Sequence, residues 1–349
     1  ASSSDFHNTG VVAAELDAID LDGGLNSVVN DGLIMSDVAG AILLQGAGNF
    51  VTNNNKIDAE DEGIFVNGAD QNIINSGEIY SRSDRGVEVF SGTRSVVVNN
   101  GTISAELEGV YLSGSEARLV NNGTITSLDQ EAVGLNVTVN GTGNRLVNNG
   151  TISTADSAED AILGDSASAD FDVVLNRGTI EGNVDLNSGD DRVFNRGDIF
   201  GDVLLEGGAD RFRAAGDGAV EGDVLGGSGN DTLVGAGGSD DFSGEGDNDL
   251  LVGRQGDDVL SGGLGDDTAR GGSGDDEING GAGDDRLFGK AGDDTVDGGD
   301  NDEFAYGGSG DDEISGGGGI DSLFGGAGED TLRGGSEDDR LYGRSDNDY

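Results

Sequence analysis

The sequence has 349 residues, of which 67 are Gly, 69 are acidic and 18 are basic, and it contains no Cys, Pro or Trp. Its formal net charge of −51 opposes binding to nucleic acid or to an anionic membrane surface, because like charges repel. Without Cys and with a single His, the chain offers almost no ligands for zinc and other soft-ligand metals. No stretch approaches the ~20 apolar residues that span a bilayer, so no transmembrane segment is expected. A hard cation remains the natural partner.

The first residues differ in composition from the rest of the chain. Low hydrophobicity with high net charge is typical of disorder, but this sequence is periodic from about residue 21 onward. Before that point, "VVAAELDAID" (11–20) fits either a short strand or a short helix. We expect residues 1–20 to form an N-terminal cap or an assembly segment.

Residues 21–225 repeat an apolar-Asn-x-Gly-x-Ile phrase, as in "INSGEI" (74–79) and "VNNGTI" (98–103). Short apolar runs separated by turn residues predict two or three strands in each unit. Successive phrases lie 22 to 28 residues apart up to Gly178, which suits a parallel β-solenoid with three faces. The Asn side chains are expected to stack into an amide ladder that satisfies the turn backbone. The expected ladder residues are Asn75, Asn99, Asn121, Asn148, Asn176 and Asn195.

A strict nine-residue period begins at Gly226 and gives thirteen full copies, with a partial fourteenth at 343–349. Position 1 is Gly and position 6 is acidic in every copy, and position 8 is apolar in every full copy. We interpret each copy as a six-residue turn followed by a three-residue strand, with the position-8 side chain in the core. Glycine suits a turn whose backbone visits conformations that a Cβ disfavours. Two copies make a coil of 18 residues, which predicts a flattened β-roll over 226–349.

The position-6 carboxylates predict a calcium site. The turns of copies n and n+2 are expected to stack directly, and a ladder of like charge then needs a cation between its members. Ca²⁺ takes six to eight oxygen ligands in irregular geometry, whereas Mg²⁺ demands a tighter octahedron. Fourteen turns on two edges leave about twelve gaps, and therefore about twelve expected calcium sites. The expected metal ligands are Asp231, Asp240, Asp249, Asp258, Asp267, Asp276, Asp285, Asp294, Glu303, Asp312, Asp321, Asp330, Asp339 and Asp348.

Two resemblances support this interpretation. Residues 226–349 resemble the RTX (repeats-in-toxin) β-roll through thirteen copies of Gly-Gly-x-Gly-x-Asp-x-apolar-x. That resemblance implies calcium-dependent folding and secretion by a type I route. Through their "NNGTI" phrases, residues 21–225 resemble the β-solenoid stalks of bacterial surface adhesins of the haemagglutinin and autotransporter type. The expected fold class is all-β, a right-handed parallel β-solenoid (β-helix) continuing into a calcium-binding RTX parallel β-roll. Glu303 departs from the pattern, so the weakest sites are expected beside it.

The first functional hypothesis is structural. A calcium-stabilised extracellular protein would form a surface filament, a surface layer or an adhesive fibre on a bacterial cell. Head-to-tail self-assembly is expected, in which residues 1–20 of one molecule contact the turns at Asp339 and Asp348 of the next. A cell-surface polysaccharide is the second candidate partner.

The alternative hypothesis is an enzyme. The chain would then be the calcium-folding module of a secreted polysaccharide-modifying or other enzyme whose catalytic part lies outside this sequence. Residues 20–225 contain no His and, of the tyrosines, only Tyr80 and Tyr111, and acidic pairs such as Asp257-Asp258 recur along the repeats instead of marking one place. We therefore expect no catalytic residue, no organic cofactor and no enzymatic activity in this chain.

Overall fold

A computed structural model describes residues 3–91, 93–129, 131–136, 143–155, 159–164 and 171–345. Within these ranges the regular elements are all strands, which pair in parallel, as β10 with β13 and β33 with β35 illustrate. The fold is an all-β parallel β-solenoid of about 15 turns, which confirms the expected fold class. In the described part of the chain no helix is long and apolar enough to cross a membrane.

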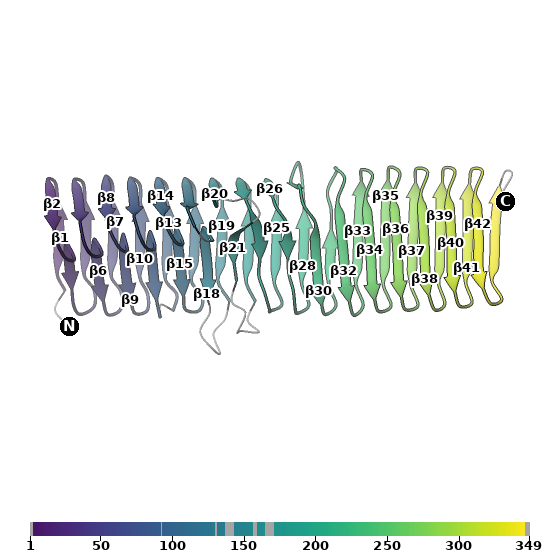
Figure 1. The fold of residues 1–349 in the computed structure, drawn as a ribbon, viewed down its shortest axis with the longest axis horizontal. Coiled ribbons are helices and arrows are strands. Elements are labelled where there is room, and N and C mark those ends of the chain that lie inside the picture. Colours follow the sequence, from purple (N-terminus) through teal and green to yellow (C-terminus); the bar gives the residue numbers. More distant parts are fainter. Residues whose placement is uncertain are drawn as a thin grey trace. The chain divides into compact units, whose positions relative to one another are not determined.

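The chain divides into two compact units, which are described separately. Unit 1 comprises residues 1–189 and 198–201, and unit 2 comprises residues 190–197 and 202–349. The strands of unit 1 run from purple to teal in Figure 1, and those of unit 2 run on to yellow.

Unit 1 is built from coils of three short strands, each of which stacks on the equivalent strand of the next coil (Figure 1). Sheet 1 contains β1 (Asp5–Asn8), β4 (Ser27–Asn30), β7 (Phe50–Asn53), β10 (Asn72–Asn75), β13 (Val96–Asn99), β16 (Arg118–Asn121), β19 (Arg145–Asn148) and β22 (Val173–Asn176). Sheet 2 contains β2 (Val11–Ala14), β5 (Leu33–Ser36), β8 (Lys56–Ala59), β11 (Glu78–Ser81), β14 (Thr102–Ala105), β17 (Thr124–Ser127), β20 (Thr151–Ser153), β23 (Thr179–Glu181) and β26 (Asp198–Phe200). Sheet 3 contains β3 (Ile19–Leu21), β6 (Ile42–Gln45), β9 (Ile64–Asn67), β12 (Val87–Phe90), β15 (Val110–Ser113), β18 (Val133–Asn136), β21 (Asp160–Leu163) and β24 (Asn183–Asp185).

The register of unit 1 places identical phrases side by side. Val97 of β13 pairs with Ile73 on one side and Leu119 on the other, and all three side chains are buried. Alternating burial along each strand sends one residue in two into the core, as the apolar runs predicted. A Cβ built on Gly123 would lie 2.0 Å from the carbonyl oxygen of Gly101, so the Gly of each Asn-x-Gly phrase permits this close stacking.

The predicted amide ladder is confirmed in unit 1. Each Asn at the end of a sheet 1 strand donates from Nδ2 to Oδ1 of the Asn one coil further on, over 2.8 to 2.9 Å. Asn121, for example, also donates to the carbonyl oxygen of Thr151, and its own Oδ1 accepts from the Gly123 N–H. The ladder contains Asn8, Asn30, Asn53, Asn75, Asn99, Asn121, Asn148 and Asn176.

Residues 1–20 contain strands of the same kind as the coils that follow. β1 pairs with β4, β2 with β5 and β3 with β6, all in parallel register. "VVAAELDAID" therefore begins with a strand (Val11–Ala14) and ends in the strand Ile19–Leu21. A role of this segment as a cap or an assembly segment stays a prediction, as do the expected domain boundaries.

Unit 2 reduces to two sheets, which form the roll (Figure 1). Its first sheet contains β25 (Arg192–Asn195), β28 (Arg211–Ala214), β31 (Thr232–Val234), β33 (Leu250–Gln255), β35 (Thr268–Ser273), β37 (Arg286–Ala291), β39 (Phe304–Ser309), β41 (Ser322–Ala327) and β43 (Arg340–Ser345). Its second sheet contains β27 (Val203–Leu204), β30 (Val224–Ser228), β32 (Asp241–Gly246), β34 (Val259–Leu264), β36 (Glu277–Ala282), β38 (Thr295–Asp300), β40 (Glu313–Gly318) and β42 (Thr331–Ser336). A short strand, β29 (Ala219–Val220), lies between β28 and β30 in the chain.

The position-8 side chains from Leu233 to Leu323 fill the core of the roll, as the period predicted, whereas Leu332 is half-buried and Leu341 is exposed. Leu251, Ile278 and Leu287, for example, are at most 1 % exposed. The prediction of three-residue strands was wrong, because the strands from β32 onward have six residues. Each includes positions 1 to 3 of the next copy, whose backbone also pairs with the copy two further on, as in Gly272 with Arg254 and Lys290.

The amide ladder allows a test with a matched pair of neighbouring residues. Asn121 is fully buried and bonded to both adjacent coils, whereas Asn122 is exposed. Replacing Asn121 with Ala would strip buried polar groups of their partners, so N121A should lower the free energy of unfolding by at least ~2 kcal/mol. N122A should stay within about 0.5 kcal/mol of wild type. Urea denaturation of both variants in calcium checks this expectation, and equal stabilities would contradict it.

Candidate calcium-binding turns

The position-6 residues lie in the turns at the two edges of the roll, each directly before a strand. Twelve of them are buried, between 0 and 8 % exposed. These are Asp231, Asp240, Asp249, Asp258, Asp267, Asp276, Asp285, Asp294, Glu303, Asp312, Asp321 and Asp330. Asp339 is half-buried, and Asp348 lies outside the described residues.

The position-6 carboxylates form two columns, one at each edge of the roll. On one edge the N–H of Asp231 donates to Oδ1 of Asp249 (2.7 Å), and the N–H of Asp249 donates to Oδ1 of Asp267 (2.7 Å). On the other edge the N–H of Asp258 donates to Oδ1 of Asp276 (2.9 Å). Since each bond joins residues 18 apart, copies n and n+2 stack directly, as predicted.

One oxygen of each carboxylate is left over. While Oδ1 accepts a backbone hydrogen bond, Oδ2 is buried and has no hydrogen-bond partner at nearly all of these positions. The residues concerned are Asp231, Asp249, Asp258, Asp267, Asp276, Asp285, Asp294, Asp312 and Asp321. Asp240 differs, because its Oδ2 accepts from the N–H of Ala236 at 3.1 Å. Buried, unpaired carboxylate oxygens are costly unless a cation compensates them.

Glycine at position 1 makes room for this oxygen. A Cβ built on Gly262 would lie 2.4 Å from Oδ2 of Asp267 and 2.5 Å from the carbonyl oxygen of Gly280. The space beside position 1 is thus lined by carboxylate and carbonyl oxygens, which are the ligands that Ca²⁺ prefers. The residues present therefore fit calcium, with Asp267 and the backbone of the stacked turns as the groups that would hold it.

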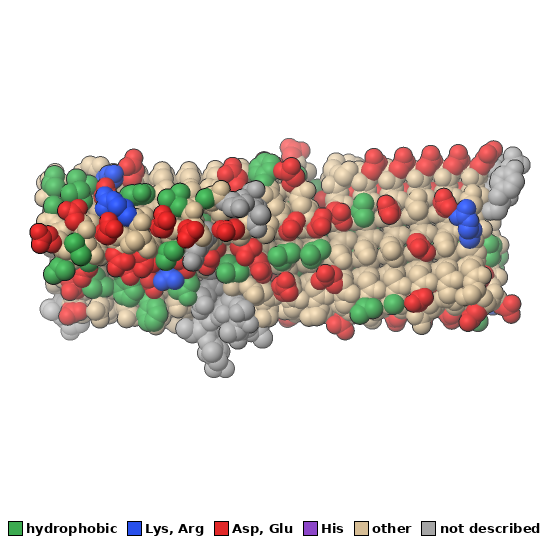
Figure 2. Space-filling model, in the orientation of Figure 1, with side chains coloured by type: hydrophobic (Ala, Val, Ile, Leu, Met, Phe, Trp, Pro, Cys, Tyr) green, Lys and Arg blue, Asp and Glu red, His purple; other side chains and the backbone are tan. Residues whose placement is uncertain are grey.

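A second acidic column, at position 5, was missed at the sequence level. Asp257 Oδ1 accepts from the N–H of Asp275 (2.9 Å), and Asp275 Oδ1 accepts from that of Asp293 (2.8 Å). A position-5 carboxylate accepts from the turn that follows it in the stack, whereas a position-6 carboxylate accepts from the turn that precedes it. The gap between two stacked turns therefore receives the position-5 side chain of one turn and the position-6 side chain of the other. The position-5 side chains are exposed, and Figure 2 shows a regular row of acidic side chains along one edge of the roll. The recurring Asp-Asp pairs were the available signal.

Burial changes the protonation of the position-6 column. Desolvation raises the pKa of Asp249, Asp258 and Asp285 from 3.8 to about 7, against the lowering effect of the backbone hydrogen bond each accepts. Neighbouring carboxylates add to the rise. Without a cation, a large part of this column would carry protons near neutral pH, so a divalent ion and protons compete for the same oxygens.

Glu303 interrupts its column. The longer side chain is buried, but neither of its carboxylate oxygens has a hydrogen-bond partner. Desolvation, with the charge of Asp321 as the next cause, raises the pKa of Glu303 to about 9. The backbone N–H of Glu303 still donates to Asp321 Oδ1 (2.9 Å), so the turn keeps its stacking while its carboxylate is displaced.

The column of oxygen acceptors also extends beyond the nonapeptides. The N–H of Asp191 donates to Asp210 Oδ1 (2.6 Å), and that of Asp210 donates to Asp231 Oδ1 (2.8 Å). In unit 1, the residue before several sheet 1 strands plays the same part with a neutral side chain, as when the N–H of Asn26 donates to Asn49 Oδ1 (3.0 Å). Asp172, before β22, is a carboxylate that accepts from the N–H of Asn144 (2.6 Å). The sequence pattern did not predict Asp210, because Leu205 stands where the repeats have Gly at position 1. The Asp-x-apolar spacing of "ADRF" (209–212) was the signal available.

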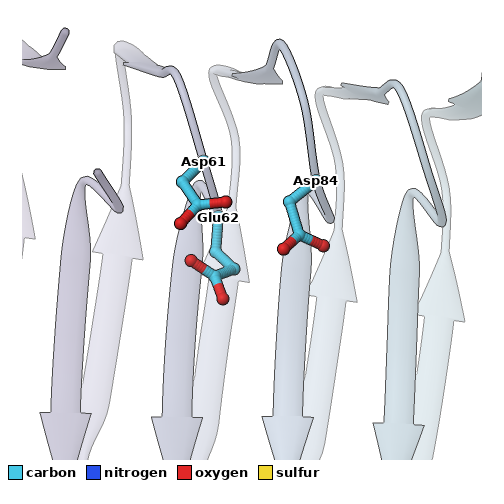
Figure 3. Close-up of side chains that lie close together, drawn as sticks. All are labelled: Asp61, Glu62 and Asp84. Atoms are coloured by element: carbon cyan, nitrogen blue, oxygen red, sulfur yellow. The ribbon is translucent and has the colours of Figure 1, made fainter. Parts of the chain in front are cut away.

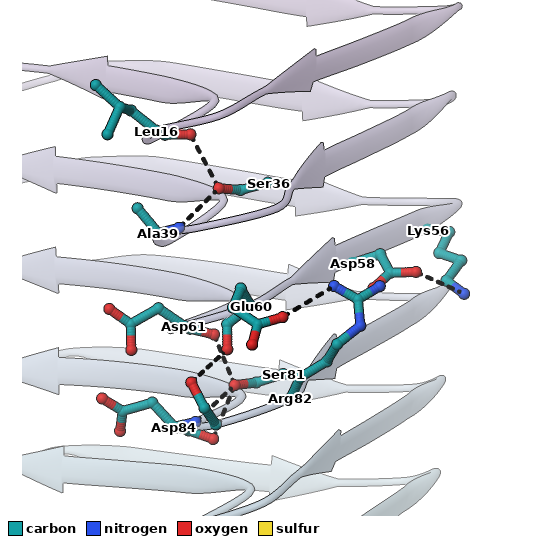
Figure 4. A network of polar contacts seen from close by, with 11 residues as sticks. Leu16, Ser36, Ala39, Lys56, Asp58, Glu60, Asp61, Ser81, Arg82 and Asp84 are labelled. Atoms are coloured by element: carbon teal, nitrogen blue, oxygen red, sulfur yellow. Dashed lines mark hydrogen bonds and ion pairs between the residues drawn. The ribbon is translucent and has the colours of Figure 1, made fainter.

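A separate acidic cluster lies in unit 1, where the sequence pattern gave no hint of a site. One carboxylate oxygen from each of Asp61, Glu62 and Asp84 lies within 4.8 Å of the others (Figure 3). Burial raises the pKa of Glu62 to about 7. Ser81 Oγ lies between the two turns, 2.6 Å from the carbonyl oxygen of Asp61 and 2.8 Å from that of Asp84, so its one O–H can donate to either (Figure 4).

Cations and an aromatic ring border this cluster. Arg85 binds Glu108 through Nε and Nη2, at 3.0 and 2.9 Å, and Glu88 through Nη1 at 3.1 Å. Its guanidinium carbon lies 4.2 Å from the centre of the Tyr111 ring. Beside the cluster, Arg82 pairs with Asp58, which also binds Lys56 at 3.1 Å (Figure 4). A pocket of about 180 Å³ is lined in part by Glu62.

Comparisons with known proteins agree with this architecture. A family model described as a right-handed beta helix region matches residues 3–177. A second model, the RTX calcium-binding nonapeptide repeat, matches residues 225–260, 252–287, 261–296, 279–314, 297–332 and 315–349. The chain belongs to the right-handed β-helix proteins, and its C-terminal part consists of RTX repeats. Those repeats imply calcium binding and are typical of secreted extracellular proteins. No curated protein and no solved structure matches the chain.

The raised pKa values predict how pH acts on the calcium-free roll. Burial raises the pKa of Asp231 to about 6 and that of Asp249 to about 7, so the folded state binds these protons more tightly than the unfolded state. This stabilisation is complete below the ordinary value of 3.8 and is lost as the pH rises through about 6 to 7. In excess chelator, the β signal of the roll in circular dichroism should be weak at pH 8 and return towards pH 5. A signal that is equally strong in chelator and in calcium at pH 8 would contradict both the pH effect and the calcium requirement.

Glu303 predicts a variant that improves the roll. Glu303→Asp shortens the side chain by one methylene and restores the acceptor for the stacked turn. It should lower the calcium concentration at the midpoint of folding, because a complete site binds the folded state more tightly. Glu313→Asp, on the exposed face of β40, is the matched control and should leave that midpoint unchanged. A calcium titration followed by circular dichroism decides, and equal midpoints for wild type and Glu303→Asp would refute the prediction.

Proposed function

We propose that this chain is a calcium-stabilised structural protein of the bacterial cell surface, which builds a filament, a surface layer or an adhesive fibre. The observation that carries the proposal is the repetition of one buried carboxylate at every turn of the roll. Asp231, Asp258 and Asp285 occupy equivalent places, where Oδ1 of each accepts from the backbone N–H of the stacked turn and Oδ2 is unpaired. Ion binding distributed in this way stiffens a length of solenoid, whereas catalysis needs one specialised place.

Calcium would act on folding and rigidity together. Each ion would pull together two stacked turns that otherwise repel, so binding free energy becomes folding free energy. An extracellular medium rich in calcium would keep the roll folded, and a calcium-poor compartment would leave it expanded by its own negative charge. This behaviour suits a protein that is secreted unfolded and that folds and becomes rigid outside the cell.

Self-assembly is the second part of the proposal. Residues 1–20 carry strands that pair like those of every other coil, and they are rich in carboxylates such as Asp5, Asp17 and Asp20. We expect this segment to contact the turns around Asp339 of a second molecule through calcium. Such a contact is heterologous and open-ended, so it would generate a filament. A cell-surface polysaccharide remains a candidate for attachment to the cell.

The enzyme hypothesis has one observation in its favour. The cluster of Asp61, Glu62 and Asp84 lies beside Arg85 and Tyr111, which is the mixture of side chains that a polysaccharide-acting β-helix would use. A Glu whose pKa is about 7 could serve as a general acid. Incubating the chain with uronic-acid and neutral polysaccharides tests this hypothesis, and depolymerisation that is lost in Glu62→Gln would favour it over the structural role.

Assembly can be tested with two forms of the protein. In millimolar calcium, light scattering of the full chain should rise with protein concentration, and negative-stain images should show elongated particles. A form that lacks residues 1–20 should give a smaller rise, because it lacks the proposed contact. Both forms should stay dispersed in chelator. Equal growth of both forms, or no growth of either, would refute the role of the N-terminal segment.

A further inference from the structure

The turn that ends at Asp210 resembles the calcium-binding turns but lies before residue 225, where the RTX match begins. Its sequence, "LEGGAD" (205–210), keeps Gly at position 4 and Asp at position 6 but has Leu at position 1. Glu206 and Gly208 have positive φ angles of 65° and 148°. The RTX turn at 226–231 has positive φ at the same two positions, so the backbone adopts the same turn.

The stacking of this turn is also that of the roll. The Gly208 N–H donates to the carbonyl oxygen of Ser228 (2.8 Å), as the Gly256 N–H donates to that of Ser273 (2.9 Å) within the repeats. The N–H of Asp210 donates to Asp231 Oδ1, which continues the position-6 column. The gap between turns 205–210 and 226–231 therefore keeps the backbone bond at position 4 and the carboxylate bond at position 6 of the roll, although Ala209 stands where position 5 often has a carboxylate.

Two buried carboxylate oxygens have no hydrogen-bond partner here. Asp210 is 0 % exposed and Asp231 is 2 % exposed, and Oδ2 of each is unpaired. The Glu206 carbonyl oxygen lies close enough to collide with a Cβ at Gly227, and the Gly208 carbonyl oxygen would collide with one at Gly229. Oxygen atoms from both turns thus converge between them.

We propose that this gap is an additional calcium site, formed by the carboxylates of Asp210 and Asp231 and by the carbonyl oxygens of Glu206 and Gly208. It rests on calcium binding by the RTX repeats, which it extends by one turn toward the N-terminus. Leu205 is fully buried and adds apolar surface where the roll has Gly, so the site should bind more weakly than those of the repeats. Desolvation accordingly raises the pKa of Asp210 to about 8, above the values of most of the column.

Native mass spectrometry of the full chain in saturating calcium can count the bound ions. Asp210→Asn keeps the acceptor for the backbone bond but removes the charge, so it should hold at least one ion fewer than wild type. Asp217→Asn, which changes an exposed carboxylate nearby, should hold the wild-type number. Equal numbers for wild type and Asp210→Asn would overturn the proposal. A wild type that binds no ions would refute calcium binding as a whole, which is a different result.

A second variant guards against misfolding of the first. Leu205→Gly restores the glycine of position 1 and removes the apolar side chain beside Asp210. It should shift the weakest step of a calcium titration to lower concentration without changing the total number of ions. An unchanged titration would count against the site even if Asp210→Asn proved unstable by circular dichroism.

The two faces of the roll carry opposite charge, which is an independent observation. In the first sheet, strands β33 to β43 contain six cationic residues and no acidic residue, whereas in the second sheet strands β32 to β42 contain six acidic residues and one cation, Arg333. Arg333 pairs with Glu313 of its own sheet. The cations are Arg254, Arg270, Arg286, Lys290, Arg340 and Arg344, and the acids are Asp241, Glu245, Glu277, Asp297, Asp300 and Glu313.

The cationic face is also aromatic. The rings of Phe304 and Phe324 lie 5.2 Å apart, and those of Phe324 and Tyr342 lie 4.7 Å apart, so the rings form a row across the strands. Lys290 lies 5.0 Å from the centre of the Phe288 ring, and Arg344 lies 5.0 Å from that of Phe324. Phe304 is 38 % exposed and Tyr342 is 46 % exposed. The acidic face has no outward aromatic residue in the described strands, because Phe242 points into the core.

The two faces are complementary in charge. Both sheets repeat at the same strand spacing of ~4.8 Å, so charged strands of one copy can lie opposite charged strands of another. Glu277 and Asp297 are exposed on the acidic face, and Arg286 and Lys290 are exposed on the cationic face. A second copy of the chain therefore offers the complementary surface in the complementary spacing.

We infer that the first sheet of one roll packs on the second sheet of another copy, side by side. The contact joins two different faces, so it is open-ended and would build a layer rather than a closed dimer. It deepens the proposed structural function, because it names a lateral partner in addition to the end contact of residues 1–20. Salt should weaken it, since exposed charges are screened within about 8 Å at physiological ionic strength.

A charge exchange tests the lateral contact. The variant Arg286→Glu with Lys290→Glu should lose lateral association in calcium, and the variant Glu277→Lys with Asp297→Lys should lose it as well. An equimolar mixture of the two should associate again, because one contact then has matched charges of exchanged sign. Arg118→Glu with Arg145→Glu, which makes the same change of charge on exposed residues of unit 1, should behave like wild type. Sedimentation velocity at several salt concentrations measures the association.

The outcomes separate this inference from the proposed function. If wild type assembles and the first variant assembles equally well, the lateral contact is wrong and the structural role stands. If wild type does not assemble at all, both fail. If the first variant loses binding to dextran sulfate, with dextran as the neutral control, but associates like wild type, the cationic face serves an anionic polysaccharide and the inference is overturned.

Discussion

The whole solenoid depends on how each coil satisfies the backbone N–H that precedes a strand. The neighbouring coil buries that N–H, so the same neighbouring coil must also supply its hydrogen-bond acceptor. Unit 1 supplies an amide oxygen, as Asn49 does for the N–H of Asn26. Unit 2 supplies a carboxylate oxygen, as Asp249 does for the N–H of Asp231. The hydrogen bond is the same in both units, but the second polar atom of the side chain is an amide nitrogen in Asn49 and a carboxylate oxygen in Asp249.

Calcium dependence follows from that remaining atom. The amide nitrogen of Asn49 donates to the carbonyl oxygen of Gly46 (2.8 Å) and leaves nothing unpaired. The second oxygen of Asp249 has no donor, and burial raises its pKa to about 7. It must therefore take up a proton or face a cation. At this place an oxygen instead of an amide NH2 group is the difference between a fully paired side chain and one that suits a cation.

The periodic part of this arrangement could be predicted from the sequence, and the rest could not. The nine-residue period placed Leu251 in the core and Asp249 at the turn, because position and burial recur together. Asp210 was missed, since Leu205 breaks the Gly motif while the backbone turn persists. The cluster of Asp61, Glu62 and Asp84 was also missed, because Asp61 and Asp84 hold equivalent places in only two neighbouring coils and Glu62 has an Arg in the equivalent place, so no repeat marks it. A repeat pattern identifies residues that have the same role in every coil, and it cannot identify a site that occurs in one coil alone.

The outward positions of the roll show the same division. Positions 6, 8 and 1 point inward, and their identities are held by packing and by the stacked turns. Positions 7, 9 and 2 face solvent, and Arg286 and Lys290 fall on one sheet while Glu277 and Asp297 fall on the other. Lys290 has a positive φ of 96°, a conformation that favours Gly, so its side chain is not there for the sake of the turn. Folding does not require that separation, since Gly and Ser occupy equivalent positions elsewhere in both sheets. A charge pattern that folding does not require is best explained by a surface that binds another molecule.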